Sequence, residues 1–444
     1  MVLVPVPKDN QIASSSRIIR SSEALLEEAL GLARAIDLNV VFSQVFSVSQ
    51  IKSATLFGIG KIDEIEQKIL ELDVDLVIVD FSLTPIQQRN LEKAWKCKVI
   101  DRTGLILEIF GRRANTKEST LQVELAHLNY QKSRLVRSWT HLERQRGGAG
   151  FLGGPGETQI ETDRRLIQKR IIKLKKELQQ VVKHRELHRK YRKKSNYPII
   201  SLVGYTNAGK STLFNLLSNS KVIAKDMLFA TLSPALREIQ LPHGTKAILS
   251  DTVGFISNLP PQLIIAFRAT LEEVVEADII LHVRDISDPD NALQAKDVYS
   301  ILEELKPKSL KNHNLIEVWN KSDLLSSSEE ESCKNLSNSS NLEYPTFLIS
   351  AETGNGIDKL LNYLENEISG ELETYKITLD VNNGKIFAFI HTYASKIKEE
   401  ISDKSKNNIT VIFTMHKEKY ELLSKMLNDK EKNKDNKNLY LNSG

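Results

Sequence analysis

One stretch of the chain has residue types and spacing suited to binding phosphate. Residues 204–211 fit the pattern G-x-x-x-x-G-K-[ST], between an apolar β-prone run (199–203) and a run compatible with a helix (211–217). Glycines let several backbone N–H groups converge on one anion, and the helix N-terminus adds its positive dipole end. We expect Lys210 to contact the β- and γ-phosphates and the Ser211 hydroxyl to bind Mg²⁺. The flanks favour a nucleotide phosphate loop over a chance glycine-rich turn.

Three further motifs follow in order, each after a strand-like run. Asp251-Thr252-Val253-Gly254 places a carboxylate where it can hold Mg²⁺ through water. Asn320-Lys321-Ser322-Asp323 places one where it can accept from N1–H and the exocyclic amine of guanine, a donor pair that adenine lacks. Ser350-Ala351-Glu352 can offer backbone N–H groups to the guanine O6. Together the four motifs predict a guanine-nucleotide site.

Three other positions bear on hydrolysis. Thr231 stands where a GTPase needs a mobile threonine that closes on Mg²⁺ and the γ-phosphate, with an ordinary loop threonine as the alternative. Phe255 stands where many GTPases carry the glutamine that orients the attacking water. Because a phenylalanine neither donates nor accepts, we predict slow intrinsic hydrolysis that a partner stimulates. Asn207 fits either a ligand of a monovalent cation such as K⁺ or a loop-stabilising hydrogen bond.

The candidate residues form overlapping sets. The candidate catalytic residues are Lys210, Thr231 and Gly254, and the candidate Mg²⁺ ligands are Ser211, Thr231 and, through water, Asp251. The predicted nucleotide-binding residues are Gly204, Tyr205, Thr206, Asn207, Ala208, Gly209, Lys210, Ser211, Thr212, Phe229, Ala230, Thr231, Leu232, Ser233, Asp251, Thr252, Val253, Gly254, Asn320, Lys321, Ser322, Asp323, Ser350, Ala351 and Glu352.

Composition narrows the class of protein. A chain of 444 residues with 41% hydrophobic and 27% charged residues is typical of a soluble protein of two to four domains. Its two cysteines, Cys97 and Cys333, lie far apart without neighbouring His or Cys, so they imply neither a disulfide framework nor a zinc site. The first ten residues do not resemble a signal peptide, and no apolar run could span a bilayer. We expect a cytoplasmic protein.

The net charge of +4 conceals a strongly basic segment. Residues 164–194 hold fourteen Lys and Arg against two Glu, a net charge of +12, so the rest of the chain sums to −8. Such a segment indicates a nucleic-acid partner, whereas a merely solvated helix face usually mixes signs. An anionic membrane is less expected, because the apolar positions form a narrow seam.

That basic segment belongs to a predicted pair of long helices. Apolar residues step by three and four along 121–142 and again along 167–181, which predicts an antiparallel hairpin, with a hairpin inside an ordinary bundle as the alternative. The link, 147–156, holds six glycines, which favours a tip that contacts a partner over a plain flexible turn. The predicted RNA-binding residues are Gly148, Gly150, Gly153, Gly154, Arg164, Arg165, Lys169, Arg170, Lys173 and Lys176.

The predicted fold class is α/β multidomain: a P-loop GTPase domain preceded by a small α/β domain and an antiparallel helical hairpin, with a small C-terminal α/β unit. Strand-like and helix-like runs alternate over 17–115, with one strand expected at 54–57, which favours a mostly parallel sheet. In the C-terminal unit we expect a helix whose inward face includes Ile386, Ile390 and Ile397. We expect a mobile loop at 324–342. The predicted domains are 1–116 (N-terminal α/β), 117–196 (hairpin), 197–370 (GTPase), 371–427 (C-terminal) and 428–444 (disordered tail).

Over roughly residues 17–370 the chain resembles the HflX-type ribosome-associated GTPases. The resemblance rests on residues 87–91 (QQRNL), 99–103 (VIDRT), 121–125 (LQVEL), 154–159 (GPGETQ) with 161–165 (ETDRR), and 251–256 (DTVGFI) with Leu259-Pro260. It implies a factor that binds the large ribosomal subunit and its rRNA, inserts the glycine-rich tip toward the peptidyl-transferase region and separates stalled ribosomes into subunits. It also implies GTP hydrolysis that the ribosome stimulates.

The expected ligands are GTP and GDP with Mg²⁺, and the expected state is a monomer with at most weak membrane association. Two other functions stay open from the sequence. One is a ribosome-assembly GTPase, and the other is a nucleotide-gated adaptor for another RNA or an anionic membrane.

Overall fold

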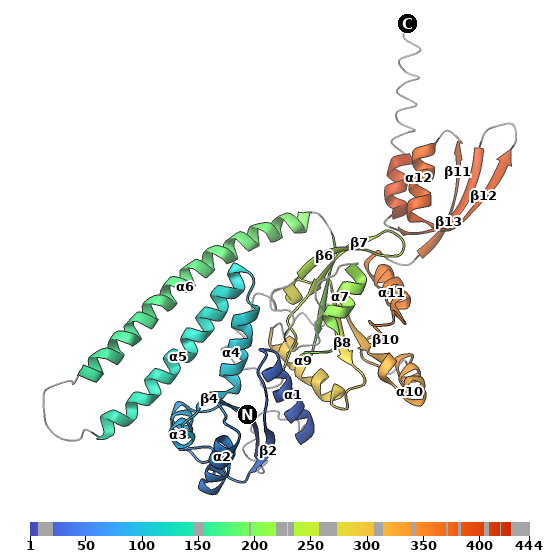
Figure 1. Ribbon diagram of the computed structural model, residues 1–444. Coiled ribbons are helices and arrows are strands. Elements are labelled where there is room, and N and C mark those ends of the chain that lie inside the picture. Colours follow the sequence, from blue (N-terminus) through green and yellow to red (C-terminus); the bar gives the residue numbers. More distant parts are fainter. Residues whose placement is uncertain are drawn as a thin grey trace.

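The computed structural model describes residues 1–7, 21–145, 155–194, 197–218, 229, 235–256, 273–305, 314–339, 342–369, 372–380, 383–403, 408–417 and 419–427. Within these residues the strands form three sheets, and a long pair of helices projects from the body of the molecule (Figure 1). The α/β multidomain fold class is therefore confirmed. No helix in this part of the chain is both long and apolar enough to cross a membrane.

The N-terminal sheet has four parallel strands in the order β2-β1-β3-β4. Its strands are β1 (Val2–Pro7), β2 (Ser43–Val48), β3 (Leu76–Val79) and β4 (Lys98–Asp101), and its helices are α1 (Ser22–Arg34), α2 (Ile59–Glu71), α3 (Pro85–Trp95) and α4 (Arg102–Arg113). Leu3, Val77 and Val99 are fully buried, as expected of parallel strands covered on both faces.

Two elements of this sheet escaped the sequence analysis, and one prediction was wrong. The β1 strand carries two prolines, a residue that usually marks a sheet edge, yet it pairs on both sides. The α4 helix follows β4 without a loop, because Asp101 ends the strand and also caps the helix by accepting from the Gly104 N–H. Residues 54–57, expected to be a strand, form a tight turn closed by a bridge between Lys52 and Leu56.

The projecting pair of helices is α5 (Lys117–Gln145) and α6 (Pro155–Lys194). Leu125 of α5 and Leu174 of α6 are buried in the apolar seam between them. Glu118 accepts from Arg185 at 2.7 Å, and Gln168 accepts from Lys132 at 2.5 Å. Contacts further along α5 are made with residues that lie earlier on α6. The two helices are therefore antiparallel. Gly156 of the link lies in α6, whereas the link's other five glycines and the tail at 428–444 lie outside the described residues.

The central sheet has six strands in the order β10-β9-β8-β5-β7-β6, of which only β6 runs antiparallel to its neighbour. Its strands are β5 (Ile199–Gly204), β6 (Ala235–Gln240), β7 (Lys246–Asp251), β8 (Ile279–Asp285), β9 (Asn314–Asn320) and β10 (Thr346–Leu348), and its helices are α7 (Lys210–Ser218), α9 (Asn291–Leu305), α10 (Ser327–Ser337) and α11 (Ile357–Ser369). The mobile loop expected at 324–342 was wrong for most of its length, since Ser326 and Glu329 form a capping box that starts α10.

The C-terminal sheet is antiparallel, in the order β11-β13-β12. It consists of β11 (Leu372–Asp380), β12 (Ser395–Asp403) and β13 (Asn408–His416), covered by α12 (Gly384–Tyr393) and by helical residues 419–427. Phe413 and Ile390 are fully buried in its core. Ile397, expected on the helix, instead lies on β12, because α12 ends at Tyr393.

A buried cation ties the N-terminal elements together. Arg102, the first residue of α4, is 6% exposed and donates to Asp80, after β3, at 2.6 Å and to Glu28 of α1. Burial alone would lower the pKa of this guanidinium, but the two carboxylates outweigh it and raise the pKa, so Arg102 stays charged. The triad joins α1, the sheet and α4 at one point.

Replacing the Arg102 guanidinium with an apolar side chain should make the protein less stable. We expect Arg102→Met to lower the free energy of unfolding by about 3–5 kcal/mol, because two buried carboxylates lose their counter-charge. The measurement is denaturant unfolding followed by circular dichroism. Arg34→Met is the matched control: its pair with Glu27 is 62% and 70% exposed, so it should change stability by less than about 1 kcal/mol. Equal stability of the two variants would contradict the structural role of Arg102.

Candidate guanine-nucleotide site

The phosphate loop joins β5 to α7, and two of its glycines are obligatory. Gly204 has a φ of +151°, and a Cβ on it would lie 2.1 Å from the Val283 carbonyl oxygen of β8. Gly209 has a φ of +88°, and a Cβ on it would lie 2.2 Å from the Asn320 amide nitrogen. Since L side chains fit neither position, the loop can only be built with glycine here.

Lys210, the first residue of α7, is buried in this loop. Its Nζ donates to the Tyr205 carbonyl at 2.6 Å. Burial lowers the pKa of the ammonium to about 8, with nearby Asp251 acting in the opposite direction. A cation so poorly solvated favours an anionic neighbour, which is the role expected of Lys210 toward the β- and γ-phosphates.

The predicted Mg²⁺ ligands meet at the end of β7. The Ser211 hydroxyl donates to Asp251 Oδ2 at 2.9 Å, and Asp251 is 2% exposed. A hydroxyl and a carboxylate are the hard oxygen donors that Mg²⁺ prefers, so this pair fits the ion. Thr231, the third predicted ligand, lies outside the described residues, as do Ala230, Leu232 and Ser233.

The guanine motifs are held against the phosphate loop by Asn320. Its amide donates to the Ala208 carbonyl at 2.9 Å, and its side-chain oxygen accepts from the Ala351 N–H at 2.9 Å. The Ser350 hydroxyl donates to Asp323 Oδ1 at 2.5 Å. The Ser350-Ala351-Glu352 motif therefore orients this exposed carboxylate. The two base motifs and the phosphate loop thus form one connected site.

The remaining predicted residues belong to the same four motifs, but not all present side chains to a ligand. The Thr252 hydroxyl donates to the Leu202 carbonyl at 2.6 Å, and Val253 is 6% exposed in a hydrophobic cluster. A Cβ on Gly254 would lie 3.0 Å from Lys210 Nζ, so the backbone there closely approaches the ammonium. Thr206, Asn207, Lys321, Ser322 and Glu352 belong to these motifs as well, and Thr212 lies on α7.

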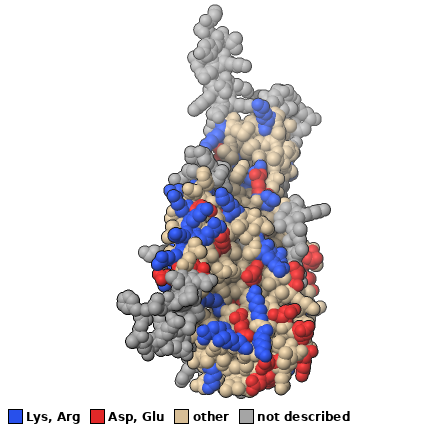
Figure 2. Space-filling model, turned by 60° about the vertical axis from the view of Figure 1, so that its left-hand side comes forward, with Lys and Arg blue, Asp and Glu red and all other residues tan. Residues whose placement is uncertain are grey.

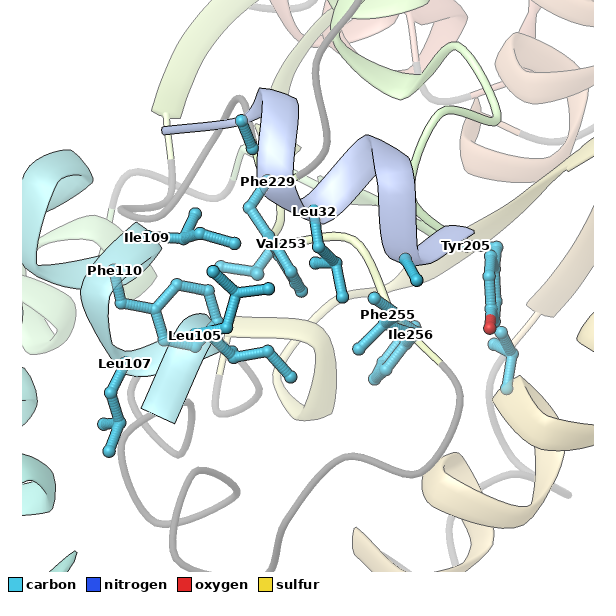
Figure 3. Close-up of a cluster of buried hydrophobic side chains, with 14 of the residues drawn as sticks. Leu32, Leu105, Leu107, Ile109, Phe110, Tyr205, Phe229, Val253, Phe255 and Ile256 are labelled. Carbon is cyan, nitrogen blue, oxygen red and sulfur yellow. The ribbon is translucent and has the colours of Figure 1, made fainter. Parts of the chain in front are cut away.

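One feature that sequence analysis missed is the contact between this site and the N-terminal domain. Phe255 closes onto the phosphate loop through hydrogen bonds with Gly204 and Thr206, of 3.0 and 2.8 Å, and its side chain is 5% exposed. Phe229, expected to bind nucleotide, packs its ring edge-to-face on Phe110 of α4 at 4.8 Å. Figure 3 shows these rings in one hydrophobic cluster between α1, α4 and the GTPase loops.

A polar contact crosses the same boundary. The Tyr205 hydroxyl of the phosphate loop donates to Glu28 Oε2 at 3.0 Å, and Glu28 is the carboxylate already paired with Arg102. The one signal in the sequence was the concentration of apolar residues at 105–110 of α4, interrupted only by Glu108. Nothing in that run identifies a distant loop as its partner.

The fold and the site together define a P-loop GTPase. Sequence profiles agree: "GTP-binding GTPase N-terminal" matches residues 23–111, "GTP-binding GTPase Middle Region" 113–192, "50S ribosome-binding GTPase" 199–321 and "HflX C-terminal domain" 336–438.

Two relatives agree with these profiles over most of the chain. The chain is 48% identical to GTPase HflX of Magnetococcus marinus, over 85% of both chains, and 43% identical to GTPase HflX of Escherichia coli, over 80% of this chain and 81% of the relative. A solved GTP-binding protein from Sulfolobus solfataricus in complex with GDP is similar at 23% identity and a TM-score of 0.43, over 83% of this chain and 98% of that chain. The chain belongs to the HflX family of GTPases, which confirms the resemblance and the assignment as a GTP hydrolase.

The depressed pKa of Lys210 predicts a pH-dependent affinity for GDP. The ligand binds the charged ammonium, so above pH 8 binding must take up a proton. We expect affinity to fall about fourfold between pH 7 and pH 8.5, from the change in the charged fraction. Titration with a fluorescent GDP analogue measures it. Lys210→Arg, charged throughout, should bind with the same affinity at both pH values, and a flat wild-type profile would refute the shift.

Asp323 should set the choice of base. We expect Asp323→Asn to weaken GTP binding by at least on the order of 10², because the amide cannot accept from both guanine donors, and to improve binding of xanthosine triphosphate. Competition titrations with the two nucleotides measure the preference. Asp358→Asn, an exposed carboxylate on α11, is the control and should leave the preference unchanged. Undiminished preference of Asp323→Asn for GTP would remove Asp323 from the base pocket.

Proposed function

We propose that this GTPase binds the large ribosomal subunit through the α5–α6 hairpin and its glycine-rich tip, separates ribosomal subunits, and leaves after GTP hydrolysis. The observation that carries the proposal is the array of exposed basic side chains along α6. Support also comes from the profile match to "50S ribosome-binding GTPase" and from membership of the HflX family. Rigid basic helices suit rRNA because they present charge to phosphates at little cost in conformational entropy.

The structure separates the basic residues of α6 into two groups. Arg170 and Arg185 pair with Glu124 and Glu118 of α5, at 2.7 Å each, so part of their charge is used to hold the hairpin together. Among the described side chains of α6, seven other basic residues are exposed: Arg164, Arg165, Lys169, Lys173, Lys175, Lys176 and Lys183. Figure 2 shows blue patches of Lys and Arg on the side of the molecule that includes the hairpin, with Asp and Glu gathered at the lower right. This second group is the proposed rRNA contact.

The proposed mechanism relies on the packing of the GTPase loops. GTP and Mg²⁺ draw in Thr231 and the Asp251–Ile256 segment, and this segment packs in one hydrophobic cluster with α1 and α4. Because α4 begins directly after Asp101, which binds Tyr130 and Arg134 midway along α5, the nucleotide state biases the orientation of the hairpin. Hydrolysis relaxes the segment and permits release.

Hydrolysis itself is expected to be slow until the ribosome is bound. Phe255 is buried among apolar side chains and cannot orient a water molecule, so the partner must order the attacking water. Asn207 has a φ of +62° and an exposed side chain on the phosphate loop. In this position it would be a ligand of K⁺. The protein is expected to act as a monomer in the cytoplasm.

The test is sucrose-gradient profiling of intact ribosomes with the purified protein and GTP, GDP or a non-hydrolysable GTP analogue. We expect the protein to sediment with large subunits in the GTP-analogue sample, subunits to separate with GTP and with the analogue, and little binding with GDP. Equal loading with GDP and GTP would contradict a nucleotide-gated factor. Flotation with anionic liposomes instead of sedimentation with ribosomes would support the membrane adaptor.

The hairpin contact is tested in the same gradients with the triple variant Lys169→Glu, Lys173→Glu and Lys176→Glu. We expect weaker cosedimentation and a shallower dependence of affinity on salt, by about two to three units of the log–log slope, because three phosphate contacts are lost. Nucleotide affinity should not change. The matched control reverses three exposed lysines elsewhere, Lys334, Lys359 and Lys385, and should bind as the wild type does. Loss of binding in the control alone would place the contact away from the hairpin.

A further inference from the structure

We propose that His243, Glu365 and His416 form a binding site for a divalent transition-metal ion of the Zn²⁺ type, which fastens the C-terminal domain to the GTPase domain. Glu365 lies on α11, and His243 lies in the turn between β6 and β7. His416 is the last residue of β13, in the other domain. Their ligand atoms all lie within 4.8 Å of one another, the one such cluster of His, Cys, Asp and Glu among the described residues.

The separations suit a small ion. His243 Nδ1 lies 3.1 Å from Glu365 Oε2, and the two imidazole rings are 5.6 Å apart between centroids, at an interplanar angle of 82°. Zinc bonds of about 2.0–2.1 Å in tetrahedral geometry place neighbouring ligand atoms about 3.3 Å apart. The His243–Glu365 pair already has that separation, and a modest rotation of the His416 ring completes a three-ligand set.

The carboxylate is fixed before any ion arrives. Glu365 is 0% exposed, and it accepts from the backbone N–H groups of His243 at 2.7 Å and Thr245 at 3.1 Å. Hydrogen bonds of this kind orient a metal-binding carboxylate. A buried carboxylate is also costly unless it is paired or coordinates a cation, and the two imidazoles beside it are ligands that a cation can use.

The donor set indicates the kind of ion. Two imidazoles with one carboxylate favour Zn²⁺ over Mg²⁺ or Ca²⁺, which prefer all-oxygen sites, and three protein ligands leave a fourth position for water. The His416 side chain is buried, whereas that of His243 is 21% exposed, so the ion has an entry path from this side. This chemistry is independent of the phosphate loop and of any ribosome contact.

The position of the site gives it a structural consequence. Beside it, a Cβ on Gly244 would lie 3.1 Å from the Tyr393 ring, so the β6–β7 turn touches the C-terminal domain at this point. The β7 strand runs from the same turn to Asp251, the proposed Mg²⁺ ligand. A bound ion would therefore hold the C-terminal domain against the far end of the strand that carries the nucleotide-site carboxylate.

The test uses the full-length protein, stripped with a chelator, dialysed and titrated with Zn²⁺ against a chromophoric competitor. We expect one Zn²⁺ per chain and a rise of the thermal midpoint on Zn²⁺ addition. The double variant His243→Ala and His416→Ala should lose at least tenfold in Zn²⁺ affinity and lose the thermal shift. Two controls should bind as the wild type does: His391→Ala, an exposed histidine on α12, and Cys97→Ser with Cys333→Ser, which excludes binding by thiols.

Equal Zn²⁺ affinity of the wild type and the double variant would overturn the proposal, provided that guanine-nucleotide affinity shows the variant to be folded. If the double variant does not fold, Co²⁺ substitution of the wild type decides. Visible d–d bands without a thiolate charge-transfer band would support the assigned ligands, and a thiolate band or no bound Co²⁺ would overturn them. These outcomes leave the ribosome experiments unaffected, so either proposal can fail without the other.

Discussion

The structure depends on a pair of adjacent residues, Asp101 and Arg102, at the junction of β4 and α4. Arg102 neutralises two buried carboxylates, and one of them, on Glu28, also accepts from Tyr205 of the phosphate loop. Asp101 accepts from Tyr130 at 2.5 Å and pairs with Arg134 at 2.7 Å, both on α5. Two side chains thus connect the N-terminal sheet, the hairpin and the nucleotide site. Buried charges of this kind tolerate few alternative arrangements, which limits how the three parts can be oriented.

This connection is reinforced by apolar packing, and the two act on the same loops. The segment that follows Asp251 and the region of Phe229 are the parts of a GTPase that move when the γ-phosphate is lost. Here their aromatic side chains are buried against α1 and α4 instead of facing solvent. Any movement of these loops must therefore either carry α4 with them or expose apolar surface, at about 25 cal/mol for each Å². Under the proposed mechanism, this packing makes the neighbouring domain part of the switch.

The sequence predicted what local chemistry determines. The four nucleotide motifs could be located because each consists of a few adjacent residues with a definite role, and the seam of α5 and α6 because its period is regular. What it did not predict depends on distant partners: Glu28 meets Tyr205 across 177 positions, and His243 meets His416 across two domains. The β1 strand was missed because its prolines contradict the usual pattern of an interior strand, and α10 because its Ser- and Glu-rich composition resembles that of a loop.

The replacement of a water-orienting side chain by Phe255 gains a physical reason from the packing. A glutamine here would place an amide in a cluster where its neighbours are apolar, at a cost of roughly 1–3 kcal/mol unless it found partners. A phenylalanine instead adds apolar area to the contact with the N-terminal domain. In this chain, the position that serves hydrolysis in many GTPases therefore contributes to the packing between domains. It follows that the water-orienting function must come from outside the buried cluster, and that the strength of domain packing and the speed of unassisted hydrolysis are opposing demands on one residue.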